Sequence, residues 1–156
     1  MFEKYEELGS IVKFFYENHD RKNDLELYFE EVPVDFKEPS IYFPAPSIFS
    51  NFFTTHSFLN TYAWYIKIFD NSSYKAQESA MKIVNKVADN RYHIPIYNYE
   101  NQATERYVKI DYIEQKKVDI GTIQIEIRFN LAYFFNREDY IKFTQFDINE
   151  TVKKQE

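Results

Sequence analysis

Hydrophobic and polar residues alternate most regularly in the last third of the chain. Within residues 122–131 every second position is apolar, and polar or charged residues stand between them; the apolar positions are Ile123, Ile125, Ile127, Phe129 and Leu131. Strict alternation predicts a strand with one buried face and one face turned to solvent or to another subunit. Residues 107–113 predict a second strand, joined to the first by a turn at 114–117 in an antiparallel hairpin.

Two segments carry the spacing of amphipathic helices. Residues 2–18 place apolar side chains at helical intervals between charged ones. Residues 73–89 place their apolar side chains on a single stripe, which consists of Ala76, Ala80, Ile83, Val84 and Val87. Asp70, Asn71, Ser72 and Ser73 precede the second segment and supply candidates for its N-cap. Residues 136–143 predict a further short helix.

The remaining apolar runs predict strands at 25–30, 40–43, 58–69 and 94–97, the third of them long and rich in aromatic and β-branched residues. Four prolines mark turns and strand ends between the first three runs: Pro33, Pro39, Pro44 and Pro46. Residues 47–57 form an aromatic connection whose secondary structure the pattern leaves open, and the polar residues 98–105 predict a loop.

The order of these elements predicts an α+β domain. We expect a mostly antiparallel sheet with the two main helices packed on one face, which leaves the other face to a partner or to polar side chains. No repeat or linker divides the chain. We therefore expect one domain over residues 1–146, followed by a flexible tail at 147–156.

Composition excludes several classes of protein. Aromatic residues make up 20% of the 156 residues, which is unlike a disordered chain. Two glycines cannot build a phosphate-binding loop. The net charge of −6 disfavours binding to a nucleic-acid backbone, and the lack of cysteine excludes disulfides and thiolate metal sites. The N-terminus lacks the apolar segment of a signal peptide, and no stretch is long enough to span a membrane.

The sequence offers no clear catalytic constellation. His19, His56 and His93 are scattered and lack the spacing of metal-binding motifs. Adjacent acidic residues occur, but nothing selects a pair that faces across a cleft, as carboxylate catalysis requires. We therefore expect no catalytic residues, no metal and no cofactor, and a function other than that of an enzyme.

The segment from Asp35 to Pro44 suggests a family. A Lys37-Glu38-Pro39 turn precedes the hydrophobic strand at 40–43, and an aromatic connection then leads into the long strand at 58–69 and the helix at 73–89. This order, which extends to the final hairpin, resembles the tail terminator (tail completion) proteins of long-tailed bacteriophages of low-GC Gram-positive hosts. The abundance of residues with AT-rich codons fits such a host.

The resemblance implies a structural virion protein that forms a hexameric ring at the head-proximal end of the tail tube. Such a ring stops tube polymerisation and joins the tail to the neck. The implied partners are further copies of the chain, the tail tube protein and a neck or connector protein, with no membrane. Genomic DNA passes through the lumen without specific binding, and assembly takes place in the host cytoplasm.

Two groups of residues are candidates for these contacts. We expect Phe36, Ile48, Phe49, Phe52 and Phe53 to form a subunit or tube interface, because aromatic residues are enriched at interface cores. The alternative is that these rings cap the domain's own core. Asp111 and Glu126 are candidates for an acidic lining of the lumen, which repels DNA; the alternative is that both are ordinary solvated charges.

Other functions remain open at this point. Another neck, connector or tail-associated virion protein has a similar size. A different class is a small acidic protein that inhibits a host enzyme by mimicking the charge of DNA, and it requires acidic residues clustered on one surface. A small-molecule-binding enzyme is a third alternative.

Overall fold

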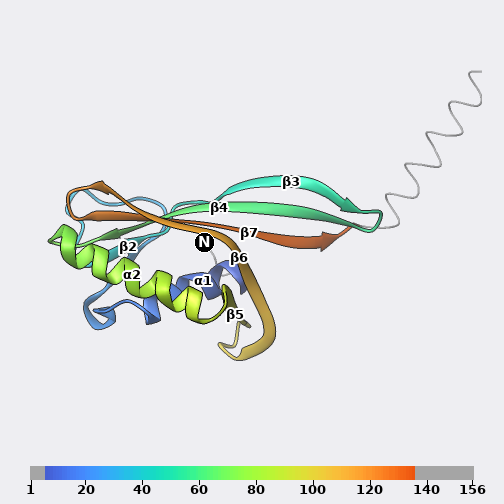
Figure 1. Cartoon of the computed structure of the whole chain (residues 1–156), viewed down its shortest axis with the longest axis horizontal. Helices are drawn as coiled ribbons and strands as arrows, with labels where there is room; N and C mark the ends of the chain where they lie inside the picture. The colour runs from blue at the N-terminus through green and yellow to red at the C-terminus, as the bar shows by residue number, and fades with distance from the viewer. Residues whose placement is uncertain (1–5, 136–156) are drawn as a thin grey trace, which may run out of the picture.

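The computed structural model describes residues 6–135 and contains two α-helices beside one large sheet (Figure 1). Among these residues no helix is both long enough and apolar enough to cross a membrane. In chain order the elements are α1 (Glu6–Glu17), η1 (Lys22–Asp24), β1 (Glu26–Tyr28), β2 (Ser40–Tyr42), β3 (Ser47–Thr54), β4 (Ser57–Phe69), α2 (Ser73–Asp89), β5 (His93–Tyr97), β6 (Ala103–Asp119) and β7 (Thr122–Phe134).

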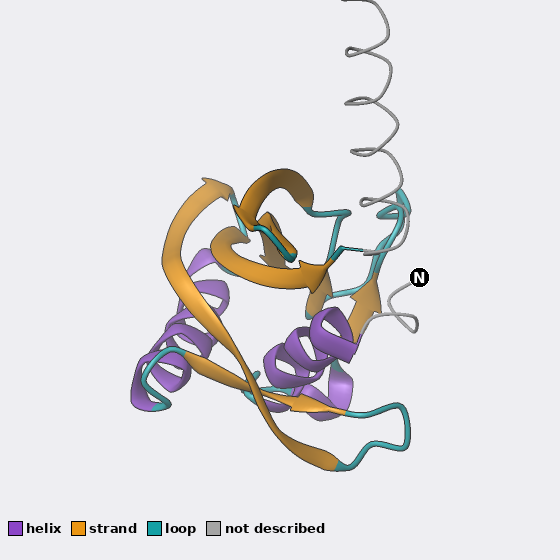
Figure 2. Ribbon diagram, turned by 90° about the vertical axis from the view of Figure 1, so that its right-hand side faces the viewer, coloured by secondary structure: helices purple, strands orange, loops and turns teal. Residues whose placement is uncertain are grey.

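The predicted fold class is confirmed. The strands lie in the order β1-β2-β4-β7-β6-β5, with β3 added to β4, and β1–β2 is the parallel pair in a sheet that is otherwise antiparallel. Both helices lie on the same side of the central strands, as Figures 1 and 2 show from two directions. The long strand β6 curves out of the central sheet toward this side, where its first half pairs with β5 (Figure 1).

The core lies between the helices and the central strands. Helix α2 begins after Ser72, whose side chain accepts a hydrogen bond of 3.1 Å from the backbone N–H of Lys75 and so caps the helix. Its predicted apolar stripe is buried against the sheet, except that Val84 is only partly buried at the edge of the core. The alternating apolar residues of β7 from Ile123 to Phe129 are buried on the same side, as the pattern predicts. The largest fully buried side chain is that of Trp64.

Three boundaries differ from the sequence prediction. The strand β6 runs through 114–117, where a turn was expected, because the charged side chains there lie in a two-stranded ladder with β7 that leaves them access to solvent. The chain reverses instead at Ile120 and Gly121, and Gly121 has the positive φ of 70° that such a turn requires. Part of the loop expected at 98–105 belongs to β6, which begins at Ala103.

The connection at 47–57 is also a strand for most of its length. It forms β3, which pairs with β4 from Ser47 opposite Ala63 to Thr54 opposite Ser57. Residues 2–5 of the first predicted helix, the predicted helix at 136–143 and the predicted tail at 147–156 lie outside the described residues.

Candidate functional site

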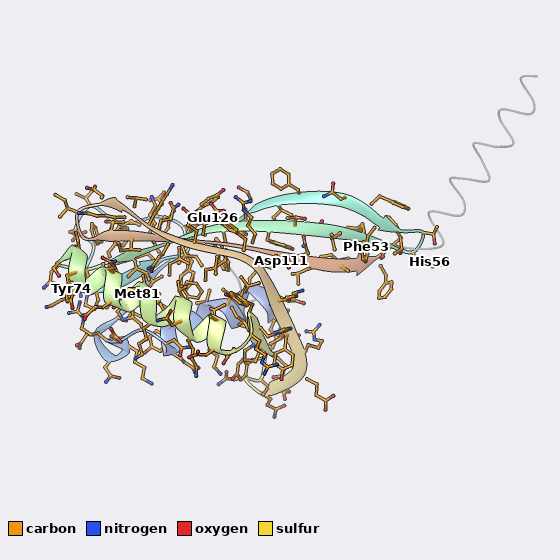
Figure 3. All side chains as sticks on the ribbon, in the orientation of Figure 1. Phe53, His56, Tyr74, Met81, Asp111 and Glu126 are labelled. Carbon is orange, nitrogen blue, oxygen red and sulfur yellow. The ribbon has the colours of Figure 1, made fainter. Side chains whose placement is uncertain are left out.

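The most distinctive surface is a three-stranded projection that we call the arm, defined as residues 47–61 and 130–135. It consists of β3, the first part of β4 and the end of β7, and it extends beyond the region that the helices cover (Figure 1). Phe53 and His56 lie near its far end, as Figure 3 shows. The arm contains no Asp, Glu, Lys or Arg, although such residues make up 28% of the chain. Its contacts must therefore come from apolar side chains, neutral polar groups and the backbone.

The arm exposes large apolar side chains to solvent. All eight residues of β3 are exposed, with exposed fractions of 53% for Ile48, 62% for Phe49, 70% for Phe52 and 56% for Phe53. Phe134 on β7 is 85% exposed. Single exposed apolar residues are common on protein surfaces, but five of them on one small projection indicate a contact region.

Apolar side chains occupy both faces of the arm. Ile48 stands opposite Tyr62 and Phe129, which are buried on the helix side of the sheet, so Ile48 belongs to that face. Phe49 stands opposite Thr61 and Asn130 on the other face. An element with apolar side chains on both faces cannot bury all of them by folding back onto one surface of its own domain.

The aromatic rings near the end of the arm contact one another only in part. The ring of Phe58 stacks on Tyr133 with centroids 5.5 Å apart, and it lies 5.5 Å from the ring of Phe135. Phe52 lies 6.3 Å from Phe135. These contacts hold the helix-side face of the arm together, and most of the Phe52 side chain still remains exposed.

Phe36 lies apart from the other four predicted interface residues. Its ring packs on Phe69, with centroids 4.9 Å apart. Phe69 is the last residue of β4, whereas Phe52 pairs with Phe58 near the first residue. At roughly 3.4 Å per residue, these two ends of the strand are more than 30 Å apart. Phe36 therefore covers one end of the sheet, and the arm projects from the other.

The structure adds Phe134 to the candidate surface. Phe134 lies beyond the alternating run at 122–131 from which the strand was predicted, and it falls on the polar side of that pattern. The sequence signal that could have identified the surface is the absence of charge: no Asp, Glu, Lys or Arg occurs between Glu38 and Lys67. This uncharged run spans β3 and most of β4.

The face of the sheet opposite the helices has polar cover. Asp111 lies on this face, where its carboxylate accepts a hydrogen bond of 2.8 Å from the side-chain amide of Asn130. The Thr61 hydroxyl donates to the amide oxygen of the same asparagine at 2.6 Å. The chain of bonds crosses three strands and ends beside Phe49, which pairs with Thr61.

Glu126 lies on the same open face and is paired with a cation. Its carboxylate accepts a hydrogen bond of 2.7 Å from Nε of Arg128, and Nη2 of the same guanidinium lies 2.7 Å from it in an ion pair. The guanidinium group also lies over the ring of Tyr112, 4.6 Å from its centroid. The Tyr112 hydroxyl donates to Glu114, and this hydrogen bond is the main reason that the pKa of Tyr112 is raised. Asp111 and Glu126 thus share a face, but neither is an isolated acidic group.

The histidines and carboxylates do not converge on a reaction centre. His19 is buried after α1, His56 lies in the β3–β4 turn, and His93 begins β5. Among residues 6–135 no group of three or more His, Asp or Glu side chains is placed to hold a metal ion. Several exposed acids are paired with bases, such as Asp20 with Lys82 at 3.1 Å and Glu6 with Arg106 at 2.7 Å. These pairs do not form the acidic cluster that a DNA mimic requires.

Comparison with known proteins gives two relatives that match almost the whole chain. The phage-like element PBSX protein XkdJ of Bacillus subtilis (strain 168) is 29% identical over 147 residues, which cover 94% of this chain and 98% of the relative. A protein of the same organism named YqbJ and described as uncharacterized is 28% identical over 148 residues, covering 95% of this chain and 99% of its own.

Protein-family models and solved structures add less. No family model matches the chain. A chain from the virion of a native gene transfer agent particle aligns with 84% of this chain and 99% of its own length, at 8% identity and a TM-score of 0.44. The sequence similarity to XkdJ, by contrast, covers nearly the whole chain.

Proposed function

We propose that the protein is a structural component of a phage-type virion and that it serves as the tail terminator. In this role it forms a ring at the head-proximal end of the tail tube, stops tube polymerisation and joins the tail to the neck. The similarity to a protein of a phage-like element supports the broader assignment to a phage-type structural protein. The order of elements around Lys37-Glu38-Pro39 is the resemblance that supports the terminator role.

The observation that carries the proposal is the uncharged aromatic arm. A folded body with polar cover on its open face does not need exposed phenylalanines for its own stability. Exposed aromatic side chains that project from such a body are suited to bury large rigid areas against other proteins. The protein acts by contact in this proposal, without a catalytic residue or a cofactor.

The two predicted groups of residues then have separate roles. Ile48, Phe49, Phe52 and Phe53 make contacts with neighbouring subunits or with the tail tube protein, while Phe36 lies at the other end of β4. The open face, with Asp111 and Glu126, faces the lumen. Glu126 neutralises the guanidinium of Arg128, so this one positive charge of the face does not act as a free site for DNA phosphates, in keeping with passage of DNA without strong binding.

Deletion of the gene in the phage or phage-like element that encodes the chain tests the proposal. We expect particles without the protein to have tails of irregular length that do not join heads, as seen by negative-stain electron microscopy. Purified protein added to such a lysate should restore joined particles. Mass spectrometry of purified wild-type virions should detect the chain at a constant ratio to the tail.

Two results would contradict the proposal in different ways. Absence of the chain from purified virions would exclude a structural virion role. Presence in virions together with tails of normal length in the deletion strain would leave a virion protein of another position, such as a neck or connector protein.

A further inference from the structure

The arm has two free strand edges. On one side, β3 pairs with β4 and with no other strand in the part of the chain that the structure describes. On the other side, the pairing of β7 with β6 ends at Phe129, so that Leu131, Ala132 and Phe134 have β4 as their one ladder partner among residues 6–135. Both edges therefore present backbone N–H and C=O groups that another strand can pair with.

The free edges lack the features that usually prevent pairing with other chains. Natural edge strands are protected by charges, by proline, by bulges or by being short. The arm has no charged residue, β3 is eight residues long, and Pro46 precedes it rather than interrupting it. The one irregularity of β3 is the register shift between Phe52 and Thr54 at its end.

We propose that the arm joins neighbouring copies of this chain by edge-to-edge strand pairing, with β3 of one copy beside the end of β7 of the next. This inference rests on the proposed ring and names the surface that builds it. β3 and β7 are different edges of one arm, and a contact between two different surfaces of identical subunits is the kind that generates a closed ring.

Charge favours a second copy as the occupant, and the exposed apolar side chains of the arm supply part of the contact area. Copies of a chain with a net charge of −6 repel one another, and the uncharged arm is where they can meet with the least repulsion. At roughly 200 Å² for a whole phenylalanine side chain, the exposed parts of Ile48, Phe49, Phe52, Phe53 and Phe134 amount to on the order of 600 Å². Each contact joins the β3 side of one copy to the β7 side of the next, so this is the exposed apolar area that both partners bring together, out of the ~1,600 Å² total of a standard interface; backbone pairing and packing of the arm against the neighbouring body have to supply the rest.

The faces of the arm also fit insertion between copies. Apolar side chains lie on both faces of the arm, and edge pairing alone would leave them exposed to solvent. An arm whose edges pair with neighbours and whose faces pack against their bodies buries both sets. The arm contributes no charged side chain to an ion pair that salt could screen, and we expect high salt not to dissociate the contact.

Engineered cysteines test this pairing, because the natural chain has none. Asn51 on β3 and Ala132 on β7 are both exposed, and each is one strand away from Leu59. Within one copy they are therefore about 10 Å apart, too far for a disulfide. Full-length Asn51→Cys and Ala132→Cys proteins should be mixed, assembled into particles and oxidised; Phe134→Cys replaces Ala132→Cys in a parallel series, to sample a second register.

We expect disulfide-linked dimers in a mixture of Asn51→Cys with Ala132→Cys or Phe134→Cys, and chains of linked copies in the corresponding double variants. The matched control pairs Glu26→Cys on the outer strand β1 with Ala132→Cys and should remain monomeric on a non-reducing gel. Wild-type particle assembly by each variant shows that the cysteines leave the protein folded.

Three results would overturn the inference. Dimers of Asn51→Cys alone would show a symmetric pairing of two β3 strands, which does not build a ring. Absence of cross-links in particles whose tails are correctly terminated would exclude the arm edges while leaving the proposed function intact. Cross-links that form only after removal of residues 136–156 would show that the chain's own C-terminal segment covers the edge.

Discussion

The rings of Tyr62 and Phe129 are stacked, with an angle of 2° between their planes and their centroids 4.9 Å apart. Both are buried, at 5% and 0% exposure, on the helix side of β4 and β7. Beyond them, the next residues on this face, Asn60 and Leu131, are only partly buried. The stacked pair therefore marks the point where the helix-covered body passes into the arm.

This boundary predicts opposite effects for two substitutions on one strand. Phe129→Ala should lower the free energy of unfolding by about 3–5 kcal/mol, because it opens a cavity in the core. Phe134→Ala, five residues further along β7, should change it by less than about 0.5 kcal/mol, because the side chain is exposed. Urea denaturation measures both. Equal destabilisation would mean that the arm is part of the folding core.

The arm should tolerate charge without unfolding. In the double variant Phe52→Asp, Phe53→Asp, both side chains are mostly exposed in wild type, so the melting temperature should change by a few degrees at most. Tail completion should be lost, because two charges would have to be desolvated in the contact between subunits.

The matched control is Phe52→Tyr, Phe53→Tyr, which keeps the rings and should preserve tails of regular length. Electron microscopy of complemented lysates gives tail length, and circular dichroism gives the melting temperature. An unfolded aspartate variant would show that these rings belong to the core. A folded aspartate variant that still completes tails would remove the arm from the interface.

The strands and helices with a regular hydrophobic pattern could be predicted because one face of each is buried in the core and the other is exposed to solvent. Ile123, Ile125 and Ile127 alternate with polar residues because one side of β7 is core and the other is wet. The pattern fails where this condition fails. In β3, Ile48 and Phe49 are neighbours on opposite faces and both are exposed, so alternation could not identify the strand.

Features of the site that depend on strand neighbours or on distant packing leave no clear pattern in the sequence. Glu114 lies opposite Glu126 in the pairing of β6 with β7. The charged run at 114–117 predicts a turn from the sequence, although the strand continues through it. Phe36 is close to the aromatic connection in sequence, but only the fold shows that it packs at the far end of β4. Free strand edges are a property of topology, and no local sequence pattern records which side of a strand lacks a neighbour.

The ion pair between Arg21 and Asp70 should matter more than its surface counterparts. The Asp70 side chain is fully buried between the segment after α1 and the start of α2, and Arg21 supplies its positive partner. Arg21→Ala leaves this carboxylate buried without a cation and should lower the free energy of unfolding by about 3–5 kcal/mol. Arg106→Ala, which breaks an exposed pair with Glu6, should cost about 1 kcal/mol or less. Equal losses in urea denaturation would contradict this assignment.

Gly121 should resist substitution for a related reason. A Cβ atom at this position would lie 2.4 Å from the carbonyl oxygen of Asp70, and the backbone φ of 70° disfavours other residues. Gly121→Ala should therefore cost at least about 2 kcal/mol in thermal or chemical denaturation. Ile120→Ala changes an exposed residue of the same turn and should have little effect. A neutral Gly121→Ala would mean that the turn relaxes away from Asp70.

His19 should make stability depend on pH in a defined window. Burial is the main reason that its pKa falls from 6.5 to about 4; Arg21 and Lys82 lower it further and Asp20 opposes them. Between these two values the unfolded chain binds a proton that the folded chain does not bind. Stability should therefore decrease as the pH falls from about 6.5 to about 4, by up to about 3 kcal/mol, and this contribution should level off below pH 4.

The variant His19→Asn isolates this contribution from that of the carboxylates. The Nδ1 atom of His19 accepts a hydrogen bond of 3.0 Å from the backbone N–H of Arg21, and the asparagine oxygen can take over this role without titrating. Urea denaturation at a series of pH values gives the free energy of unfolding of each protein as a function of pH. Above pH 7 the slope of this curve should be the same for wild type and variant. Between pH 4 and 6.5 the wild-type protein should lose stability faster than the variant. Parallel curves through that window would show that His19 binds its proton equally well in the folded and unfolded chains.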